Sequence, residues 1–247
     1  MAKQSGLGDN FYIAGYDVSG DLASVNVSGG PAALEVTGID KSAYERTGGL
    51  RTGAMSWQAW FNPATDRAHS RFKTLPTADV ITTYCRGTTL GNSAAAMVAK
   101  QINYDGTRGD DGSFTFQVEA QSNAFGLEWG RLLTAGKRTD TTATNGSSVD
   151  FGTGSTTFGL QAYLHVFAFT GTSVTVKLQE SSDNGGADAW ADVTGGAFTA
   201  ATGITSQRIA TSSTQTVERY LRVVTTGTFS NAVFAVVVNR NDTATSF

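Results

Sequence analysis

Apolar and polar residues alternate with a period of two along most of the chain, the pattern of β-strands with one buried face. Phe114, Phe116 and Val118 alternate with polar residues, and the same alternation returns over residues 174–178. Residues 232–238 are continuously apolar, which suits a strand covered on both faces. We predict the remaining strands at 55–61, 80–85, 97–104, 160–169 and 221–223.

An Ala-rich piece at residues 94–99 has helical propensity, but it runs without a break into a predicted hairpin. That hairpin joins residues 97–104 to residues 113–121 through the turn-rich segment 105–112. For this reason we interpret residues 94–99 as strand.

One short helix is predicted over residues 64–73. Asn62 can cap its start, and Pro63 fits its first turn. Three apolar side chains at spacings of four and three share one side of this helix, so we expect that side to pack on a sheet. They are Ala68, Phe72 and Leu75.

The chain divides into two parts by composition. Residues 1–135 contain all three prolines and the predicted helix, whereas residues 158–247 contain only short strands separated by glycine turns. Residues 136–157 have few large apolar side chains and indicate a linker or a long surface loop. We therefore expect a mainly β protein with an α+β domain followed by an all-β sandwich of jelly-roll or immunoglobulin-like type.

Residues that commonly carry catalysis or bind zinc are scarce. The chain has two His, His69 and His165, and one Cys, Cys85. General bases, activated nucleophiles and zinc ligands are mostly drawn from these residue types, because they titrate or ligate near neutral pH. We expect no catalytic, cofactor or metal site, and a protein that is not an enzyme.

Charge and hydropathy exclude two further classes of partner. The net charge is −3 and the chain has no run of Lys and Arg, so stable binding to nucleic acid is not expected. No apolar run approaches the roughly 20 residues that span a bilayer, so we expect no membrane insertion. Residues 1–10 lack the apolar core of a signal peptide, which favours assembly in a cytoplasm.

One weak candidate for a surface ligand contact lies in the second half. Trp190 follows a Gly-rich turn that contains Asp183 and Asp188, and an exposed Trp ring can stack on a sugar. The simpler interpretation is that Trp190 anchors a strand in the core. The two carboxylates are equally typical of an ordinary turn, and they lack the spacing of a calcium loop.

Two stretches resemble known bacteriophage proteins. Residues 15–61 read GYDVSGDLASVNV, then LEVTGIDKSAYERTGGLRTG, then AMSWQAWF. They resemble the amino-terminal portion of major tail proteins of long non-contractile-tailed phages (siphophages), particularly those that infect actinobacteria. Two later stretches, VKLQESSDNGGADAWADV and RYLRVVTTGTFSNAVFAVVV, resemble a β-sandwich module that recurs in phage tail proteins. The matching motifs are turns and apolar strand patterns, without a catalytic signature.

The resemblance implies a structural virion protein of the phage tail, assembled in the host bacterial cytoplasm. It implies a tail-tube-like β-sandwich or barrel with one flanking helix, hexameric rings that stack into a tube, and an outward C-terminal decoration domain. DNA would only pass through during ejection. Tape-measure, tail-tip and terminator proteins would be the partners. The strands expected in the tube wall are those at 55–61, 80–85, 97–104 and 113–121.

Within this interpretation, the long loop at residues 40–53 is expected to contact the next ring. It has glycines for a tight path, and it carries charged and apolar residues for pairing between subunits. These residues are Lys41, Glu45, Arg46, Leu50 and Arg51.

Two other classes remain open. The first is a capsid-decoration or receptor-binding (glycan-binding) phage structural protein built from similar sandwiches. The second is a carbohydrate-binding or hydrolytic module, which would need an exposed Trp platform and a pair of carboxylates. The scattered positions of the four Trp residues fit the second class poorly.

Overall fold

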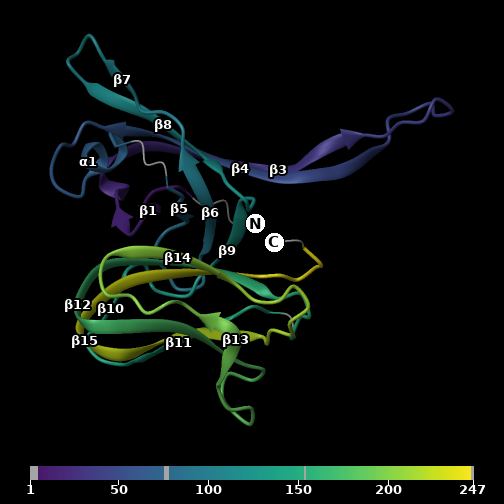
Figure 1. Cartoon of the computed structure of the whole chain (residues 1–247), viewed down its shortest axis with the longest axis vertical. Helices are drawn as coiled ribbons and strands as arrows, with labels where there is room; N and C mark the ends of the chain where they lie inside the picture. The colour runs from purple at the N-terminus through teal and green to yellow at the C-terminus, as the bar shows by residue number, and fades with distance from the viewer. Residues whose placement is uncertain (1–4, 75–77, 153, 246–247) are drawn as a thin grey trace. The chain divides into compact units, whose positions relative to one another are not determined.

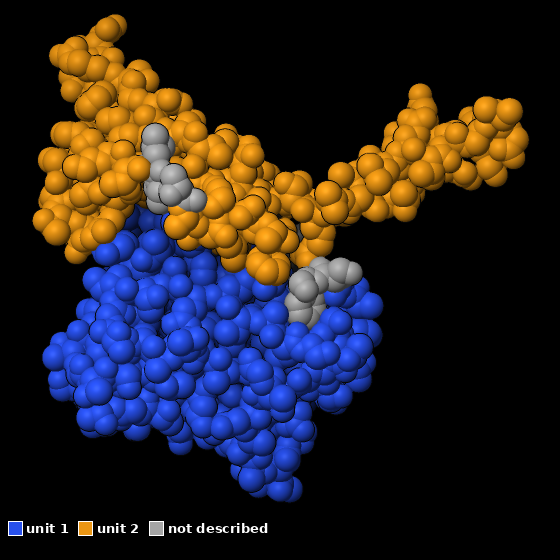
Figure 2. All heavy atoms as spheres, viewed as in Figure 1, with its two compact units in different colours: residues 1–20, 80–96, 128–247 blue, residues 21–79, 97–127 orange. Residues whose placement is uncertain are grey.

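The computed structural model describes residues 5–74, 78–152 and 154–245, and it confirms a mainly β, sandwich-like fold (Figure 1). The chain forms two compact units, coloured separately in Figure 2. Unit 1 contains residues 1–20, 80–96 and 128–247, and unit 2 contains residues 21–79 and 97–127. Each unit is therefore built from segments that are far apart in the sequence.

Unit 1 is built around two long strands, β12 (Leu160–Ser181) and β15 (Tyr220–Arg240). They pair antiparallel over their whole length, from Leu160 opposite Arg240 to Ser181 opposite Tyr220. The shorter strands β13 (Ala191–Ala197) and β14 (Thr205–Ala210) pair with β12. Those that pair with β15 are β9 (Glu128–Leu132), β10 (Arg138–Asp140) and β11 (Asn145–Asp150).

The β12–β15 ribbon bends over on itself, and this bend makes the sandwich. The pairing register shifts between Val166 and Ser173, and such bulges let a strand turn from one layer into the other. Gly171 and Gly227 lie at the bend with φ angles of 151° and 123°, which favour glycine. Inward side chains from both halves of the ribbon, such as Leu164 and Leu178, then share one core.

Residues 136–157 differ from the expected linker or loop, because they contain β10 and β11. Thr139 lies opposite Val233, and Val149 lies opposite Leu221. The two strands have three and six residues, and Val149 is their one buried aliphatic side chain. Backbone pairing with β15 stabilises them, which explains why their composition resembles that of a loop.

The N-terminal residues belong to unit 1, so the compact units also differ from the expected division at 135 and 158. Strands β1 (Asn10–Ile13) and β2 (Tyr16–Asp17) form a hairpin, and β1 pairs with β5 (Val80–Cys85). The hairpin turn is Ala14-Gly15, and both residues have positive φ angles, of 51° and 83°. This is the backbone of a two-residue turn that matches the twist of a hairpin.

Unit 2 is a sheet centred on β4 (Arg46–Trp60), which pairs with β3 (Leu22–Glu35) and β8 (Phe114–Ser122). Strand β7 (Asp105–Arg108) pairs with β8. Strand β6 (Ser93–Gln101) begins in unit 1 and pairs with β8 at its end. The apolar face of the sheet includes Met55, Trp57 and Val118, and the ring of Trp57 lies 5.4 Å from that of Phe72 on α1.

The helix α1 (Ala68–Phe72) is shorter than predicted and starts differently. Its first residue, Ala68, donates its backbone N–H to Asp21 Oδ2 at 3.0 Å, while Arg67 makes no side-chain cap. Asn62, the predicted cap, accepts from Ala64 N at 3.2 Å in the turn before α1 and donates to Asp21 Oδ1 at 2.8 Å. Ala68 and Phe72 are buried as predicted, and Leu75 lies outside the described residues.

The hairpin predicted from 97–104 and 113–121 is also corrected. The Ala-rich piece is strand, as predicted, but most of β8 pairs with β4 and β7. Residues 105–108, expected in the turn, form β7, with Gly106 opposite Phe116. A Cβ at Gly106 would lie 2.8 Å from the Phe116 ring, so this glycine allows the aromatic ring to cover the strand.

Candidate assembly interface

A two-stranded arm projects from the sheet of unit 2 (Figures 1 and 2). Strand β4 pairs with β8 from Ala54 to Trp60, and the β3–β4 ladder continues beyond this point to Glu35 opposite Arg46. Along the ladder between Glu35 and Ala54, and among the described residues, β3 and β4 pair only with each other. We define the arm as residues 30–52.

The base of the arm is fixed by close packing. Leu127 lies against two glycines that face each other across the β3–β4 ladder, Gly29 and Gly53. A Cβ on either glycine would lie 2.7–2.8 Å from the Leu127 Cβ, so neither position has room for a side chain. Gly53 also donates its N–H to Ser122 Oγ at 2.8 Å, and Arg51 Nη2 donates to the Leu127 carbonyl at 3.4 Å.

The tip of the arm, residues 36–45, is an organised loop. Val36 donates its backbone N–H to the Glu45 carbonyl at 3.0 Å, and Glu45 donates its own to Thr37 Oγ1 at 3.0 Å. Lys41 Nζ lies 3.5 Å from Glu45 Oε1 and 3.8 Å from Asp40 Oδ2. The charges at the tip are therefore largely paired within the loop.

Large apolar side chains of the arm are exposed. Ile39 is fully exposed, Leu50 is 87% exposed and Tyr44 is 70% exposed, while Leu34 and Val36 are about half exposed. The Arg46 guanidinium lies 5.2 Å from the Tyr44 ring centroid, which adds a cation–π contact on the same surface. A cluster of exposed apolar side chains on a projecting element is typical of an interaction site.

Backbone groups along the arm are also open to pairing. In the part of the chain that the structure describes, β3 pairs on one edge only, so its other edge presents unpaired N–H and C=O groups. A long open edge is a template for pairing with another strand, and proteins usually cover or interrupt it. The arm thus combines exposed apolar side chains with open backbone edges.

The arm holds all five residues that sequence analysis proposed for subunit contact. Lys41 and Glu45 lie in the tip loop, but the other three, Arg46, Leu50 and Arg51, lie on strand β4. The expected loop at 40–53 is therefore a loop only as far as residue 45. The arm also exposes Leu34, Val36, Ile39 and Tyr44, which were not among the predicted contact residues, because their local pattern does not distinguish an exposed hairpin from a buried one.

The other candidate residues, around Trp190, serve their own turn. Asp183 accepts backbone hydrogen bonds from Gly186, Ala187 and Asp188, and the bond from Asp188 does most to lower the pKa of the Asp183 carboxyl. Asp188 accepts a bond from Ser182 N at 2.7 Å, which lowers its pKa in the same way. These carboxylates therefore close the turn.

The Trp190 ring is half-buried and already has partners. The Arg222 guanidinium lies 4.4 Å from its centroid, and Gly185 packs against its Nε1 edge. Arg222 is held in turn by Gln179 Oε1, at 3.0 Å from Nε and 2.6 Å from Nη2. The structure therefore brings Asp183, Asp188 and Trp190 into one region, but it does not present the Trp ring as an open platform.

Residue types that carry catalysis are used in packing. His165 is buried and its Nε2 lies 2.9 Å from Thr83 Oγ1. Cys85 is buried, and this burial raises the pKa of its thiol, which disfavours the reactive thiolate. His69 Nδ1 lies 2.8 Å from the Tyr104 hydroxyl. Within residues 5–74, 78–152 and 154–245, no three His, Cys, Asp or Glu are grouped to hold a metal ion.

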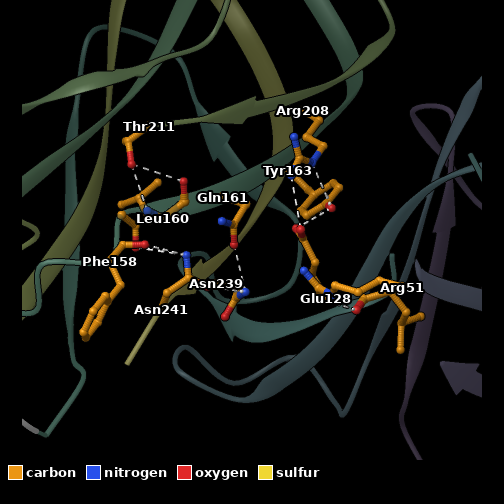
Figure 3. Close-up of polar contacts among 12 residues, drawn as sticks. Arg51, Glu128, Phe158, Leu160, Gln161, Tyr163, Arg208, Thr211, Asn239 and Asn241 are labelled. Carbon is orange, nitrogen blue, oxygen red and sulfur yellow. Dashed lines mark hydrogen bonds and ion pairs between the residues drawn. The ribbon is translucent and has the colours of Figure 1, made fainter. Parts of the chain in front are cut away.

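Buried polar groups in unit 1 hydrogen-bond to one another (Figure 3). Tyr163 donates its hydroxyl to Glu128 Oε2 at 2.6 Å, and Arg208 reaches both residues, at 3.1 Å from the Tyr163 hydroxyl and 3.2 Å from Glu128 Oε1. Burial, followed by the Glu128 charge, raises the pKa of Tyr163. Asn239 donates to Gln161 Oε1 at 2.9 Å nearby. Tyr163, Glu128 and Arg208 therefore pair with one another, whereas the buried Gln161 Nε2 has no hydrogen-bond partner among the described residues.

A cavity of about 300 Å³ also lies in unit 1. Leu90 and Leu133 give it apolar lining, and Asn145 and Ser147 give it polar lining. The guanidinium of Arg138 in its wall is neutralised by Asp140 at 2.7 Å. The cavity therefore offers a neutral surface of modest size.

No helix among the described residues has the length and apolarity needed to cross a membrane.

The comparisons with known proteins gave structural neighbours but no family. The sequence matches no family model and no curated protein. The virion of a native gene transfer agent matches 51% of this chain and 98% of its own, with a TM-score of 0.42 and 15% identity. The tail of an empty gene transfer agent particle, with C6 symmetry, has a TM-score of 0.41, 16% identity and the same coverage.

Two further neighbours cover most of both chains. The Dit protein of phage SPP1 matches 94% of this chain and 98% of its own, with a TM-score of 0.32 and 11% identity. A chain of the phage p2 baseplate matches 95% and 99%, with a TM-score of 0.35 and 10% identity. At these scores and identities the likeness does not identify the family or the role of the chain.

Proposed function

We propose that this protein is a structural subunit of a phage tail that polymerises as stacked hexameric rings into the tail tube, rather than an enzyme. The observation that carries the proposal is the arm of residues 30–52, whose large apolar side chains and backbone edges are left open. The arm also lies within residues 15–61, the stretch whose sequence resembles major tail proteins.

The energetics favour an arm that is covered by another subunit. Removing a Leu, Ile or Tyr side chain from water contributes about 1.5–3 kcal/mol when burial is complete. The arm exposes five large apolar side chains, so covering several of them contributes several kcal/mol per contact. That gain offsets part of the entropy lost on association, and ring closure repeats it in every subunit.

One sheet face of unit 2 suits the wall of a DNA passage. The face opposite the core, formed by β3, β4, β7 and β8, is lined by Ser56, Gln58, Thr115, Gln117 and Glu119. Its charges on these strands, Glu119 and Asp105, are acidic, and Lys100 on the neighbouring β6 is paired with Asp79 at 2.7 Å. Tight DNA binding needs clustered Lys and Arg on the phosphates, so a neutral to acidic wall lets DNA slide past. We assign this face to the lumen.

The remaining parts of the proposal follow from the same resemblance. The sandwich at residues 158–247 would decorate the outside of the tube, and tape-measure, tail-tip and terminator proteins would be the partners. The protein would act in the virion tail as the conduit for DNA ejection, after assembly in the host cytoplasm.

A second candidate is a capsid-decoration or glycan-binding phage structural protein. The neutral cavity near Asn145 and Ser147 favours it as a place for a small neutral ligand. The two candidates differ in assembly, because a tube needs stacked six-fold rings, whereas decoration and receptor-binding proteins most often form trimers.

Electron microscopy of the purified, concentrated protein tests the proposal. Six-fold rings or hollow tubes are the expected result. A compact trimer as the assembled species would overturn it in favour of the second candidate.

A further inference from the structure

Unit 2 has a second exposed apolar surface, distinct from the arm. Phe61 and Phe114 are 42% and 40% exposed, and their ring centroids lie 5.4 Å apart. Phe61 N donates to the Phe114 carbonyl at 3.0 Å, so the two residues are joined through their backbones. With His69, Tyr104 and Phe116 beneath them, they form what we define as the aromatic patch.

The aromatic patch is preorganised. The Tyr104 ring stacks on Phe116 at 4.1 Å with an interplanar angle of 2°, and the His69 ring lies 4.6 Å from Phe61. The hydrogen bond between His69 Nδ1 and the Tyr104 hydroxyl, 2.8 Å long, fixes the base of the patch. A rigid aromatic surface loses little side-chain entropy when another surface covers it.

The arm and the aromatic patch lie at opposite ends of unit 2 (Figures 1 and 2). In Figure 1 the arm extends to the right, while α1 and β7, beside the patch, lie to the left. Every copy of the chain therefore presents two unlike apolar surfaces at different ends of unit 2. Unlike surfaces suit a heterologous contact, in which one copy uses its arm and the next uses its patch.

Charge and size fit the two surfaces to each other. Strand β4 of the arm carries Arg46 and Arg51, with Glu35 of β3 opposite Arg46, and the turn between β7 and β8, beside the patch, exposes Asp110 and Asp111. Arginine also stacks well on aromatic rings. A stable interface uses about 20–30 residues a side, and a two-stranded arm of this length supplies about that number.

We propose that the arm of one copy docks on the aromatic patch of the next copy. The inference rests on the proposed role of the arm in assembly, and it names the surface that receives the arm. Leu50 and Ile39 would cover the exposed edges of Phe61 and Phe114, and Arg46 would face Asp110. Such a head-to-tail contact closes into a ring when its rotation permits, and otherwise continues as a filament.

Two charge-introducing variants test the proposal by light scattering. Leu50→Glu blocks the arm and leaves the patch intact, while Phe114→Glu blocks the patch and leaves the arm intact. Each variant alone is expected to need more than about tenfold higher concentration to assemble. Mixed at equal concentration, they should form a 1:1 complex that grows no further. Leu7→Glu, a matched control at a 90% exposed residue of unit 1, should assemble like wild type.

The outcomes separate this inference from the proposed function. Normal assembly of Phe114→Glu with a block in Leu50→Glu would overturn the patch and leave the role of the arm standing. Normal assembly of both variants would overturn both proposals. Two blocked variants that fail to complement would contradict the head-to-tail contact.

Photo-crosslinking tests the same contact under conditions in which assembly is weak. A photoreactive amino acid at position 50 of the full chain should crosslink to a peptide containing residues 105–116 of a second copy. Crosslinks from arm to arm would show a two-fold contact and overturn the proposal.

Discussion

The backbone N–H of Gly15 donates a hydrogen bond to Nδ1 of the buried His165, 3.2 Å away and 150 residues later in the chain. Because Nδ1 accepts this bond, the neutral ring carries its proton on Nε2, which donates to Thr83 Oγ1 at 2.9 Å. Burial lowers the pKa of His165 to about 3. The imidazole therefore joins the β1–β2 turn, β5 and β12 as an uncharged bridge.

This bridge predicts a pH dependence of stability. The pKa of His165 is about 3 in the folded state and about 6.5 in an unfolded chain. The stability that depends on the neutral His165 ring is fully present above pH 6.5. It is lost as the pH falls from 6.5 toward 3, because in this range only the unfolded state takes up the proton. The free energy of unfolding should fall by about 2 kcal/mol from this group between pH 7 and pH 5.

Urea unfolding of wild type and His165→Gln at both pH values measures this effect. Gln can still accept from Gly15 and donate to Thr83, but it does not titrate. The variant should therefore lose less stability on acidification. An equal loss in both proteins would contradict the assignment.

Asp21 is predicted to stabilise unit 2 by capping α1 from outside the helix. Its carboxylate accepts from Ala68 N at 3.0 Å and from Asn62 Nδ2 at 2.8 Å. Asp21→Ala should lower the free energy of unfolding by about 1–2 kcal/mol, because the helix start loses its acceptor. Asp79→Ala, at a half-exposed carboxylate of unit 2 that pairs with Lys100, is the control and should cost less than half as much. Equal costs in urea unfolding would contradict the cap.

The base of the arm is predicted to tolerate no side chain at Gly53. A Cβ there would lie 2.7 Å from the Leu127 Cβ, so Gly53→Ala should cost about 1–3 kcal/mol. Gly30→Ala is the matched control, since a Cβ at Gly30 meets nothing within 4 Å. Leu127→Ala should not rescue Gly53→Ala in thermal unfolding, because alanine keeps the Cβ and the backbone atoms that the new Cβ meets. If Gly53→Ala were as stable as Gly30→Ala, the close contact between Gly53 and Leu127 would be contradicted.

Substitutions at the buried ion pair of Arg208 and Glu128 are predicted to have non-additive effects on the free energy of unfolding. Arg208→Met leaves Glu128 buried without its cation and should cost about 3–5 kcal/mol. Replacing both residues by Met should cost less than Arg208→Met alone, because no buried charge then remains. A double-mutant cycle in urea measures the coupling, and additive costs would contradict it.

Local patterns predicted the strands well where one face is buried. The alternation at Phe114, Phe116 and Val118 lies in β8, and the Ala-rich piece lies in β6. Strands β10 and β11 were missed because β15 stabilises them through backbone pairing. Val149 is their one aliphatic residue, and it is buried. A strand that depends on its partner leaves little periodicity to detect.

Long-range contacts explain the other differences. The cap of α1 is Asp21, 47 residues before Ala68, so no local signal could identify it. The N-terminal residues join unit 1 through β5 and His165, which lie far along the chain. The five residues predicted for subunit contact all lie on the arm, and their contact with another subunit stays a prediction. The exposure of Ile39 and Tyr44 was not predictable, because an isolated hairpin and a buried one have the same local pattern.

The central claim is that the arm drives self-assembly, and solution mass by light scattering tests it most directly. Wild type should grow into rings or tubes as its concentration rises, whereas a variant lacking residues 41–51, which removes the tip loop and the end of β4, should remain a folded monomer that unfolds cooperatively on heating. Assemblies of wild-type size and length from the deletion variant would contradict the account.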